Sequence, residues 1–303
     1  MTKDQTAGKT KKAVRFLKLF LKILVTVACF WYLSTKLNFT SAWNALGSAN
    51  IAWLLPAFLL FIISKIISAY RLNLYFLPAG VKLSAVKNMK LYWLGMFYNL
   101  FLPGAISGDA YKVILLNKHY KASFKKLSAA VLLDRISGVL ALGCILAAYG
   151  FFLPALQDLR VLLAAGALLA IAGYYLLLHF LFPYFMEGFF PTLLMGFAVQ
   201  LAQVIAIYCL MQSLDIPFVR HEWIFIFLAS AVISILPLSL GGGLGTRELV
   251  FAEGARFFGL NPINGVVISL LFYLVTVAGS LPGLIYQFKD PLSEEDKTKA
   301  ASF

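Results

Sequence analysis

Charged residues are scarce in this sequence. Only 13% of its 303 residues are charged, whereas 61% are hydrophobic. A water-soluble domain carries roughly 25% charged residues, so this composition excludes an ordinary soluble domain. Continuous apolar runs of about 18 residues or more are typical of membrane-spanning helices, and they lack the alternation of barrel strands. We therefore predict an all-α, polytopic membrane protein.

Residues that commonly catalyse reactions or bind metals are also few. The three histidines lie far apart, and no Ser–His–Asp or Cys–His set has a usable spacing. No complete nucleotide-binding glycine motif is present. We expect no enzymatic activity, no catalytic residue, no metal site and no cofactor. The three cysteines lie inside apolar runs without a spaced pair, which is typical of small buried residues: Cys29, Cys144 and Cys209.

Basic residues nevertheless outnumber acidic ones by 26 to 13, which gives a formal net charge of +13. They gather in short loops beside the apolar runs, as in the cytoplasmic loops of membrane proteins. A basic face of this kind attracts anionic lipid headgroups. The excess therefore indicates membrane lipid as the partner and gives no reason to expect nucleic acid.

The apolar runs divide the chain into one membrane domain with two tails. Residues 1–15 form a basic tail that we expect to be disordered, residues 16–288 a single transmembrane domain, and residues 289–303 a polar tail. Within the domain, two pseudo-repeats are expected at about 51–150 and 191–288. Six spans are expected at about 19–35, 51–69, 127–150, 161–182, 191–212 and 264–288.

Two apolar stretches, 99–112 and 236–248, are interrupted by proline, glycine and charge. Such a break is costly in lipid unless protein or water satisfies the freed backbone groups. Two broken segments in corresponding halves of a chain are typical of transporters. The residues expected to break or turn the backbone are Pro103, Gly104, Gly108, Pro237, Gly241, Gly242, Gly243 and Gly245.

Charge suggests how these stretches meet the membrane. Both flanks of the first, 82–90 and 118–126, are basic, so we expect a re-entrant helical hairpin that enters and leaves on the cytoplasmic side. Three spans separate the two stretches, which would make the second hairpin enter from the opposite face and form an inverted repeat. Both termini would then lie in the cytoplasm of a cell whose inner membrane holds the chain. Because residues 223–240 could extend ~27 Å as a helix, an arrangement of eight full spans remains the alternative.

The second stretch offers a candidate site for an anion. Thr246 is a good N-cap, and the free N–H groups of a helix that begins there would attract a phosphate. Arg247 could bind the phosphate with its planar fork, and Glu248 suits the first turn. Two alternatives stay open: the glycines could pack helices closely, or Arg247 and Glu248 could form structural ion pairs with Asp109 or Asp134.

The first stretch offers a similar set. Ser107 or Asp109 would cap a helix, with Lys112 one turn inside. Asp134 and Arg135 lie ~10 Å deep in their span, where ionisable groups face a cavity or a partner. Because adjacent residues do not share a helix face, these two should reach different partners, one of them a hairpin tip. We interpret Thr246, Arg247, Arg135 and Lys112 as headgroup-binding residues, and Asp109, Glu248 and Asp134 as residues that pair with them or hold a cationic headgroup.

Three further polar residues inside apolar runs have simpler interpretations. Gln200 and Gln203 are three apart on one helix face, which favours interhelical hydrogen bonds. Lys65 would extend towards the interface as an anchor.

At these residues the chain resembles a known family. The run 99–109, the Asp134–Arg135 pair and the stretch 237–248 look like the flippase-like transmembrane half of lysylphosphatidylglycerol synthases and of their stand-alone relatives. The likeness extends over about 15–288, and it places Asp109, Arg247 and Glu248 on motif positions. It implies translocation of a lipid, such as aminoacylated phosphatidylglycerol, between leaflets. The soluble aminoacyl-transferase domain of the full synthases has no counterpart here, so synthase activity is not expected.

The leading hypothesis is therefore a lipid flippase or scramblase-type transporter. One alternative is a non-catalytic membrane subunit that presents a lipid or polyprenyl-phosphate substrate to a separate transferase. Another is a membrane-embedded transferase or hydrolase, against which the lack of a nucleophile set argues. Co-purification with a partner enzyme would favour the first alternative, and lipid turnover by the purified chain would favour the second.

Overall fold

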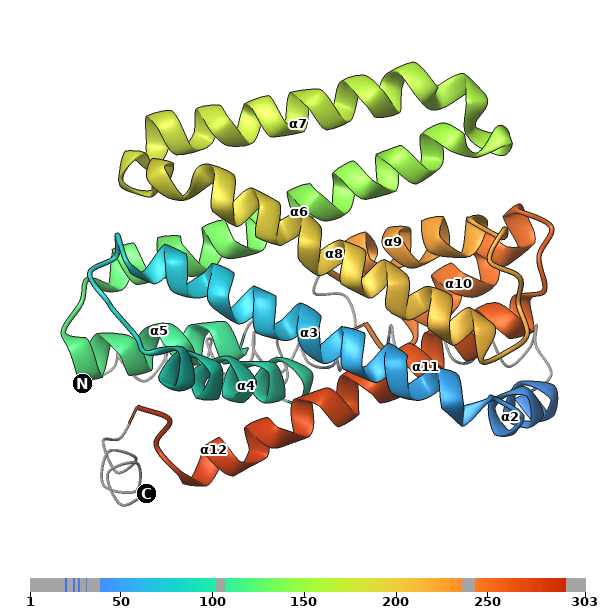
Figure 1. The fold of residues 1–303 in the computed structure, drawn as a ribbon, viewed down its shortest axis with the longest axis horizontal. Coiled ribbons are helices and arrows are strands. Elements are labelled where there is room, and N and C mark those ends of the chain that lie inside the picture. The colour runs from blue at the N-terminus through green and yellow to red at the C-terminus, as the bar shows by residue number, and fades with distance from the viewer. Residues whose placement is uncertain are drawn as a thin grey trace, which may run out of the picture.

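The computed structural model describes residues 39–101, 107–235 and 243–292, together with the helical residues Phe20, Leu24, Val27 and Trp31. Every regular element in this part of the chain is a helix (Figure 1). The α-helices are α2 (Phe39–Gly47), α3 (Ile51–Phe76), α4 (Ala85–Phe101), α5 (Ser107–Tyr120), α6 (Phe124–Phe152), α7 (Arg160–Leu181), α8 (Phe189–Gln212), α9 (Glu222–Ile235), α10 (Thr246–Phe257), α11 (Pro262–Ser280) and α12 (Ile285–Phe288). Three short 3-10 helices, Pro154–Leu159, Pro183–Gly188 and Leu281–Leu284, adjoin α7, α8 and α12.

Five of the described helices, counted with adjoining 3-10 turns, are long and apolar enough to cross a membrane. They are Ile51–Phe76, Phe124–Phe152, Pro154–Leu181, Pro183–Gln212 and Pro262–Phe288. Each coincides with one of the spans expected from the sequence. The sixth expected span, 19–35, lies outside the described residues except for four isolated positions. The chain is thus an all-α, multi-pass membrane protein.

Asparagine caps begin two of these spans. The Asn50 side chain accepts a hydrogen bond from the Ala52 amide at 2.9 Å, and the Asn261 side chain accepts one from the Ile263 amide at 2.9 Å. Each satisfies an amide that the first turn of a helix leaves free. Pro262 occupies the first position of α11, where its missing N–H costs nothing.

The long helices pack around α3 and α8, which lie against each other through the centre of the molecule (Figure 1). Helix α6 contacts α8 on one side and α7 on the other. Only 11% of the most apolar stretch of Pro154–Leu181 is buried, against 50% in Phe124–Phe152, so α7 presents apolar side chains outward. A surface of this kind suits contact with lipid tails.

The two interrupted stretches fall in two pairs of shorter helices. In the first helix pair, α4 and α5, a Cβ added to Gly108 would overlap the Gly95 backbone, so the two helices meet at their glycines. In the second helix pair, α9 and α10, a Cβ added to Gly254 would lie 2.9 Å from Ile226. The two pairs lie at opposite ends of the molecule (Figure 1). Pro103, Gly104, Pro237, Gly241 and Gly242, expected to form the breaks, lie outside the described residues.

Neighbouring helices hold the first helix pair in place. The Asn88 side chain donates to the Ala69 carbonyl of α3 at 2.6 Å, and the Trp93 indole donates to the Gly279 carbonyl of α11 at 3.0 Å. Both bonds satisfy a backbone group that belongs to a longer helix. The pair is therefore fixed against α3 and α11 along the length of α4.

Candidate functional site

The end of the first helix pair is held by Asn99. Its side-chain oxygen accepts a hydrogen bond from the Gly108 amide at 2.9 Å, across the interruption. Helix α5 begins at Ser107, so Gly108 lies in its first turn and is helical. The sequence had indicated Gly108 as part of the turn itself. The structure corrects this, because the missing side chain at Gly108 serves the close approach to Gly95.

Asp109 is the centre of a buried charge cluster in this turn. It is 8% exposed and accepts a bond from the Lys112 ammonium at 3.0 Å and a second one from the Arg135 guanidinium of α6. Lys112 is 4% exposed, and its ammonium also lies 4.8 Å from the centre of the Tyr92 ring. Two cations thus share one carboxylate. The negative charge of Asp109 is fully compensated, whereas the two positive charges of Lys112 and Arg135 are compensated only in part.

A second ion pair lies one residue away along α6. The Arg71 Nε atom donates to Asp134 Oδ1 at 2.7 Å, from a side chain of which only 5% is exposed. Asp134 therefore reaches α3 while Arg135 reaches α5. The prediction that these neighbours have different partners is confirmed.

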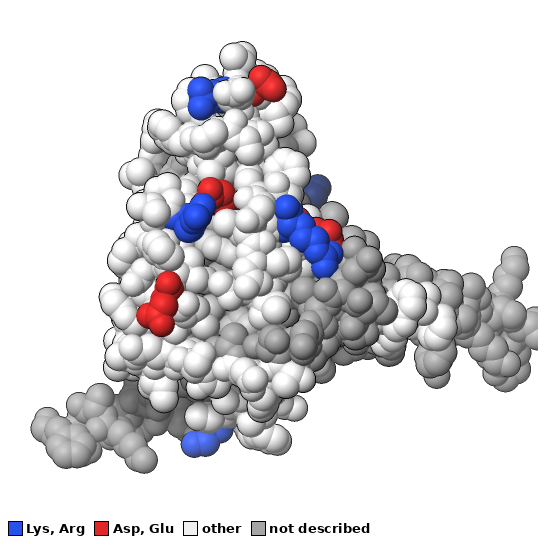
Figure 2. Space-filling view, turned by 90° about the vertical axis from the view of Figure 1, so that its right-hand side faces the viewer, with Lys and Arg blue, Asp and Glu red and all other residues white. Residues whose placement is uncertain are grey.

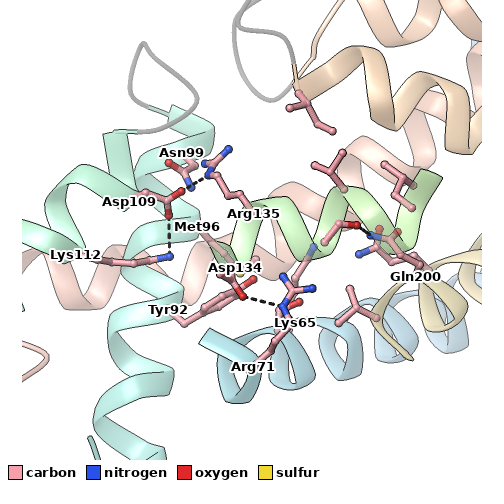
Figure 3. Close-up of a pocket in the computed structure, with 17 residues that line it drawn as sticks. Lys65, Arg71, Tyr92, Met96, Asn99, Asp109, Lys112, Asp134, Arg135 and Gln200 are labelled. Atoms are coloured by element: carbon pink, nitrogen blue, oxygen red, sulfur yellow. Dashed lines mark hydrogen bonds and ion pairs between the residues drawn. The ribbon is translucent and has the colours of Figure 1, made fainter. Parts of the chain in front are cut away.

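These groups line one cavity of about 330 Å³ (Figure 3). Its polar lining comes from four consecutive helices, α3, α4, α5 and α6, and α8 adds two glutamines. Ile235, the last residue of α9, also lines it, so the end of the second helix pair approaches the same space. The polar and charged lining residues are Lys65, Ser68, Arg71, Tyr92, Asn99, Asp109, Lys112, Asp134, Arg135, Gln200 and Gln203.

The two glutamines form the interhelical bonds that their spacing predicted. Gln200 donates to the Gly138 carbonyl of α6 at 3.3 Å, and Gln203 donates to the Ser64 hydroxyl of α3 at 3.5 Å. Both also face the cavity. The interpretation of Lys65 as an interface anchor is corrected, because it lines the cavity with its ammonium 4.6 Å from the Phe61 ring centre.

A separate polar cluster lies at the beginning of α10. Glu248 is fully buried and accepts bonds from the Gly245 amide at 2.7 Å and from the Ser269 hydroxyl of α11 at 2.9 Å. Arg247 donates two hydrogen bonds to the same Ser269, one to its hydroxyl oxygen at 3.0 Å and one to its carbonyl oxygen at 2.8 Å. Its guanidinium also lies over the Phe272 and Tyr273 rings, at 5.4 and 5.7 Å. This cluster ties the second helix pair to α11.

The N-cap of α10 differs from the expected one. The cap is Gly245, with a φ of +86°, and the Thr246 hydroxyl donates to the Gly243 carbonyl at 2.9 Å. Gly243 also has a positive φ, of +104°. The turn before α10 therefore depends on glycine conformations, as the sequence predicted for these two positions. Thr246 and Arg247, both expected to bind a headgroup, do not line the described cavity.

Of the expected headgroup and pairing residues, the structure brings Asp109, Lys112, Asp134 and Arg135 together. It adds Lys65 and Arg71 of α3, which the sequence analysis had not assigned to the site. Their spacing could have indicated them, because Lys65, Ser68 and Arg71 follow at intervals of three and therefore lie on neighbouring parts of one helix face. Among the described residues, no group of three His, Cys, Asp or Glu side chains is placed to hold a metal ion.

The fold and the site together define a class of protein: a multi-pass helical membrane protein with a buried charge cluster among its helices. Residues 19–191, more than half of the chain, match the family described as the lysylphosphatidylglycerol synthase TM region. The chain belongs to this family. The matched part contains the first interrupted stretch and the Asp134–Arg135 pair, and it ends before the second interrupted stretch.

One curated relative is the UPF0104 membrane protein PH1989 of Pyrococcus horikoshii. It is 30% identical to this chain over 128 residues, which cover 42% of this chain and 37% of the relative. The chain thus matches little more than a third of that relative's length. The relative's printed name describes a membrane protein and assigns no activity.

Proposed function

We propose that this protein moves a phospholipid headgroup between the leaflets of the membrane. The supporting observation is the cavity of about 330 Å³, which holds four basic and two acidic side chains among helices that face lipid. Ionisable residues at this depth are costly unless they serve a partner or a pathway. The headgroup would occupy the cavity while the tails stay in the bilayer.

In this proposal the two helix pairs are re-entrant. At ~1.5 Å per residue, the 17 residues of α4 extend ~26 Å and the 12 residues of α10 extend ~18 Å, both less than the ~30 Å hydrocarbon core. Their positions at opposite ends fit entry from opposite faces, as in an inverted repeat. Each pair would then bring its interruption towards the membrane interior.

The distribution of charge supports an orientation. The end of the molecule where α3, α5 and α7 finish carries a series of lysines in its loops and nearby helix ends. The opposite end shows only small patches of both signs on a mostly uncharged surface (Figure 2). By the positive-inside rule, the lysine-rich end would face the cytoplasm, together with both termini. These lysines are Lys82, Lys87, Lys90, Lys118, Lys121, Lys125, Lys126 and Lys289.

Within the cavity, Lys112 and Arg135 would contact the lipid headgroup, and each would then give up part of its interaction with Asp109. Asp109 would keep these two cations in place when no lipid is bound, and Asp134 would do the same for Arg71. Arg247, Thr246 and Glu248 would act on the second helix pair by fixing its turn against α11. Lysylphosphatidylglycerol, the lipid in the family's description, is one candidate cargo.

The test is headgroup movement in proteoliposomes that contain a fluorescent phospholipid. Lys112→Gln removes a cation that is 4% exposed in the cavity, and Lys118→Gln removes an exposed cation on the same helix, outside the cavity. We expect Lys112→Gln to slow movement by about tenfold, equivalent to ~1.4 kcal/mol, and Lys118→Gln to leave it unchanged. Equal rates for the parent and for Lys112→Gln would contradict the site, and no movement by the parent would contradict the function.

A further inference from the structure

The charges that line the cavity do not balance. Lys65, Arg71, Lys112 and Arg135 face Asp109 and Asp134, so the described lining has four cations against two carboxylates, an excess of two. A ligand with two negative charges would therefore neutralise this space.

The cations differ in how far their own partners satisfy them. Lys112 and Arg135 both bond to Asp109. Arg71 bonds to Asp134 through Nε, but its Nη1 atom is buried without a hydrogen-bond partner. Lys65 has no carboxylate partner among the described residues, and its ammonium rests over the Phe61 ring. A buried donor that lacks a partner costs free energy, so a ligand oxygen at Arg71 Nη1 would be stabilised.

The Arg71 guanidinium lies against two glycines, where an added Cβ would be 3.2 Å from Nη2 at Gly138 and 3.4 Å from Nη1 at Gly196. Figure 3 shows Lys65 and Arg71 on the same part of α3, beside Asp134. The guanidinium fork and a nearby ammonium are a common combination for binding phosphate.

We propose that Lys65 and Arg71 form the seat of a phosphate monoester, and that the lipid accepted by the cavity ends in such a dianionic phosphate. This inference rests on the proposed function, because it names the class of lipid that the cavity receives. A phosphate diester carries a single negative charge and would leave one cation uncompensated. An aminoacylated diester such as lysylphosphatidylglycerol carries ammonium groups and would increase the positive charge of the cavity.

Two short-chain lipids that differ by one methyl group test this inference. Dioctanoyl phosphatidic acid is a monoester with two negative charges at about pH 8, because its second pKa is near 6. Dioctanoyl phosphatidylmethanol has the same tails and a methylated phosphate with a single charge. Calorimetric titration of the purified chain in a nonionic detergent should show at least about tenfold tighter binding of phosphatidic acid. Equal affinities, or tighter binding of lysylphosphatidylglycerol, would overturn the proposal.

Variants of Lys65 and Arg71 then test whether these two residues cause the preference for phosphatidic acid. Lys65→Met keeps the length of the side chain without its charge and should reduce the preference to about threefold or less, while Lys118→Met should keep it. Arg71→Lys keeps the positive charge of the ion pair but removes the planar guanidinium fork. It should therefore weaken the binding of phosphatidic acid more than the binding of phosphatidylmethanol. A full preference in Lys65→Met and Arg71→Lys would place the phosphate elsewhere and overturn the assignment.

The same titrations separate this inference from the transport proposal. Inorganic phosphate should not displace bound phosphatidic acid at matching concentrations, and displacement would show a site for soluble phosphate and overturn the lipid assignment. Preferential binding without any lipid movement in proteoliposomes would sustain the monoester seat and contradict the transport function. Movement of diester lipids without preferential binding would contradict the seat alone.

Discussion

At the scale of single residues, the glycines before α10 show how the backbone enters an unusual conformation. Gly243 and Gly245 have φ values of +104° and +86°, which lie in the region that residues with a Cβ rarely adopt. Glu248 stabilises the result, because its carboxylate accepts the Gly245 amide from within the first turn of the helix. The turn therefore depends on glycine at positions 243 and 245.

Replacing Gly243 should destabilise the second helix pair. In Gly243→Ala the new Cβ would lie 2.6 Å from the Ser234 hydroxyl, which is too close. The alanine would also have to adopt the positive φ of position 243, so both a steric clash and backbone strain oppose the substitution. We expect a loss of ~1–3 kcal/mol in stability, measured as a lower unfolding temperature in detergent. Gly173→Ala, where nothing lies within 4 Å, is the control and should cause no loss. Equal unfolding temperatures for the two variants would contradict the strained turn.

The sequence predicted some residues of the site and missed others for a physical reason. Asp134 and Arg135 could be assigned different partners, because positions 100° apart on a helix must face different neighbours. Lys65 and Arg71 were not assigned to the site, because hydropathy ended this span at 69 and placed both cations near the interface, which outweighed their spacing on one helix face. Helix α3 continues to Phe76 and carries them past the cavity.

At the scale of elements, the first helix pair sets the position of Lys112 through glycine. A Cβ on Gly95 would lie 2.9 Å from the ammonium of Lys112 and closer still to its Cε atom, so the lysine occupies space that the glycine leaves open. The same glycine meets Gly108 of the facing helix. The spacing of α4 and α5 and the placement of a cavity cation thus share one cause.

Gly95→Ala should therefore affect both folding and transport. The added methyl group would force Lys112 away from Asp109, leaving a buried carboxylate with one cation fewer. We expect a lower unfolding temperature and several-fold slower lipid movement in proteoliposomes. Gly143→Ala on α6, where an added Cβ meets open space, should change neither quantity. The interpretation fails if Gly95→Ala moves lipid as fast as this control.

The lengths of the elements were predicted less well than their number. Apolar runs predicted six spans, and the five that the structure describes lie at the expected places. All of these five except Pro262–Phe288 extend past the first charged residue at one end, because a charged residue does not end a helix when its side chain is satisfied. The interrupted stretches were recognised from proline and glycine. Their partners across the fold, such as Asn99 for the Gly108 amide, depend on tertiary packing that periodicity does not contain.

At the scale of the whole molecule, the proposed orientation can be tested by labelling single cysteines in a chain from which Cys29, Cys144 and Cys209 have been removed. Ser123→Cys lies in the exposed loop before α6, and Val219→Cys, at a position 74% exposed, lies between α8 and α9 at the opposite end. A membrane-impermeant maleimide applied to intact cells should label Val219→Cys only. Labelling of Ser123→Cys from outside the cell would contradict the orientation, and with it the entry side of the first helix pair.

The neighbouring positions of Asp134 and Arg135 also carry a mechanical consequence. One is tied to α3 and the other to α5, on two sides of the same turn of α6. A rotation of α6 about its own axis would therefore have to break at least one of these two ion pairs. A ligand that displaces either carboxylate from its cation would therefore remove one of the two contacts that fix how α6 is turned towards α3 and α5.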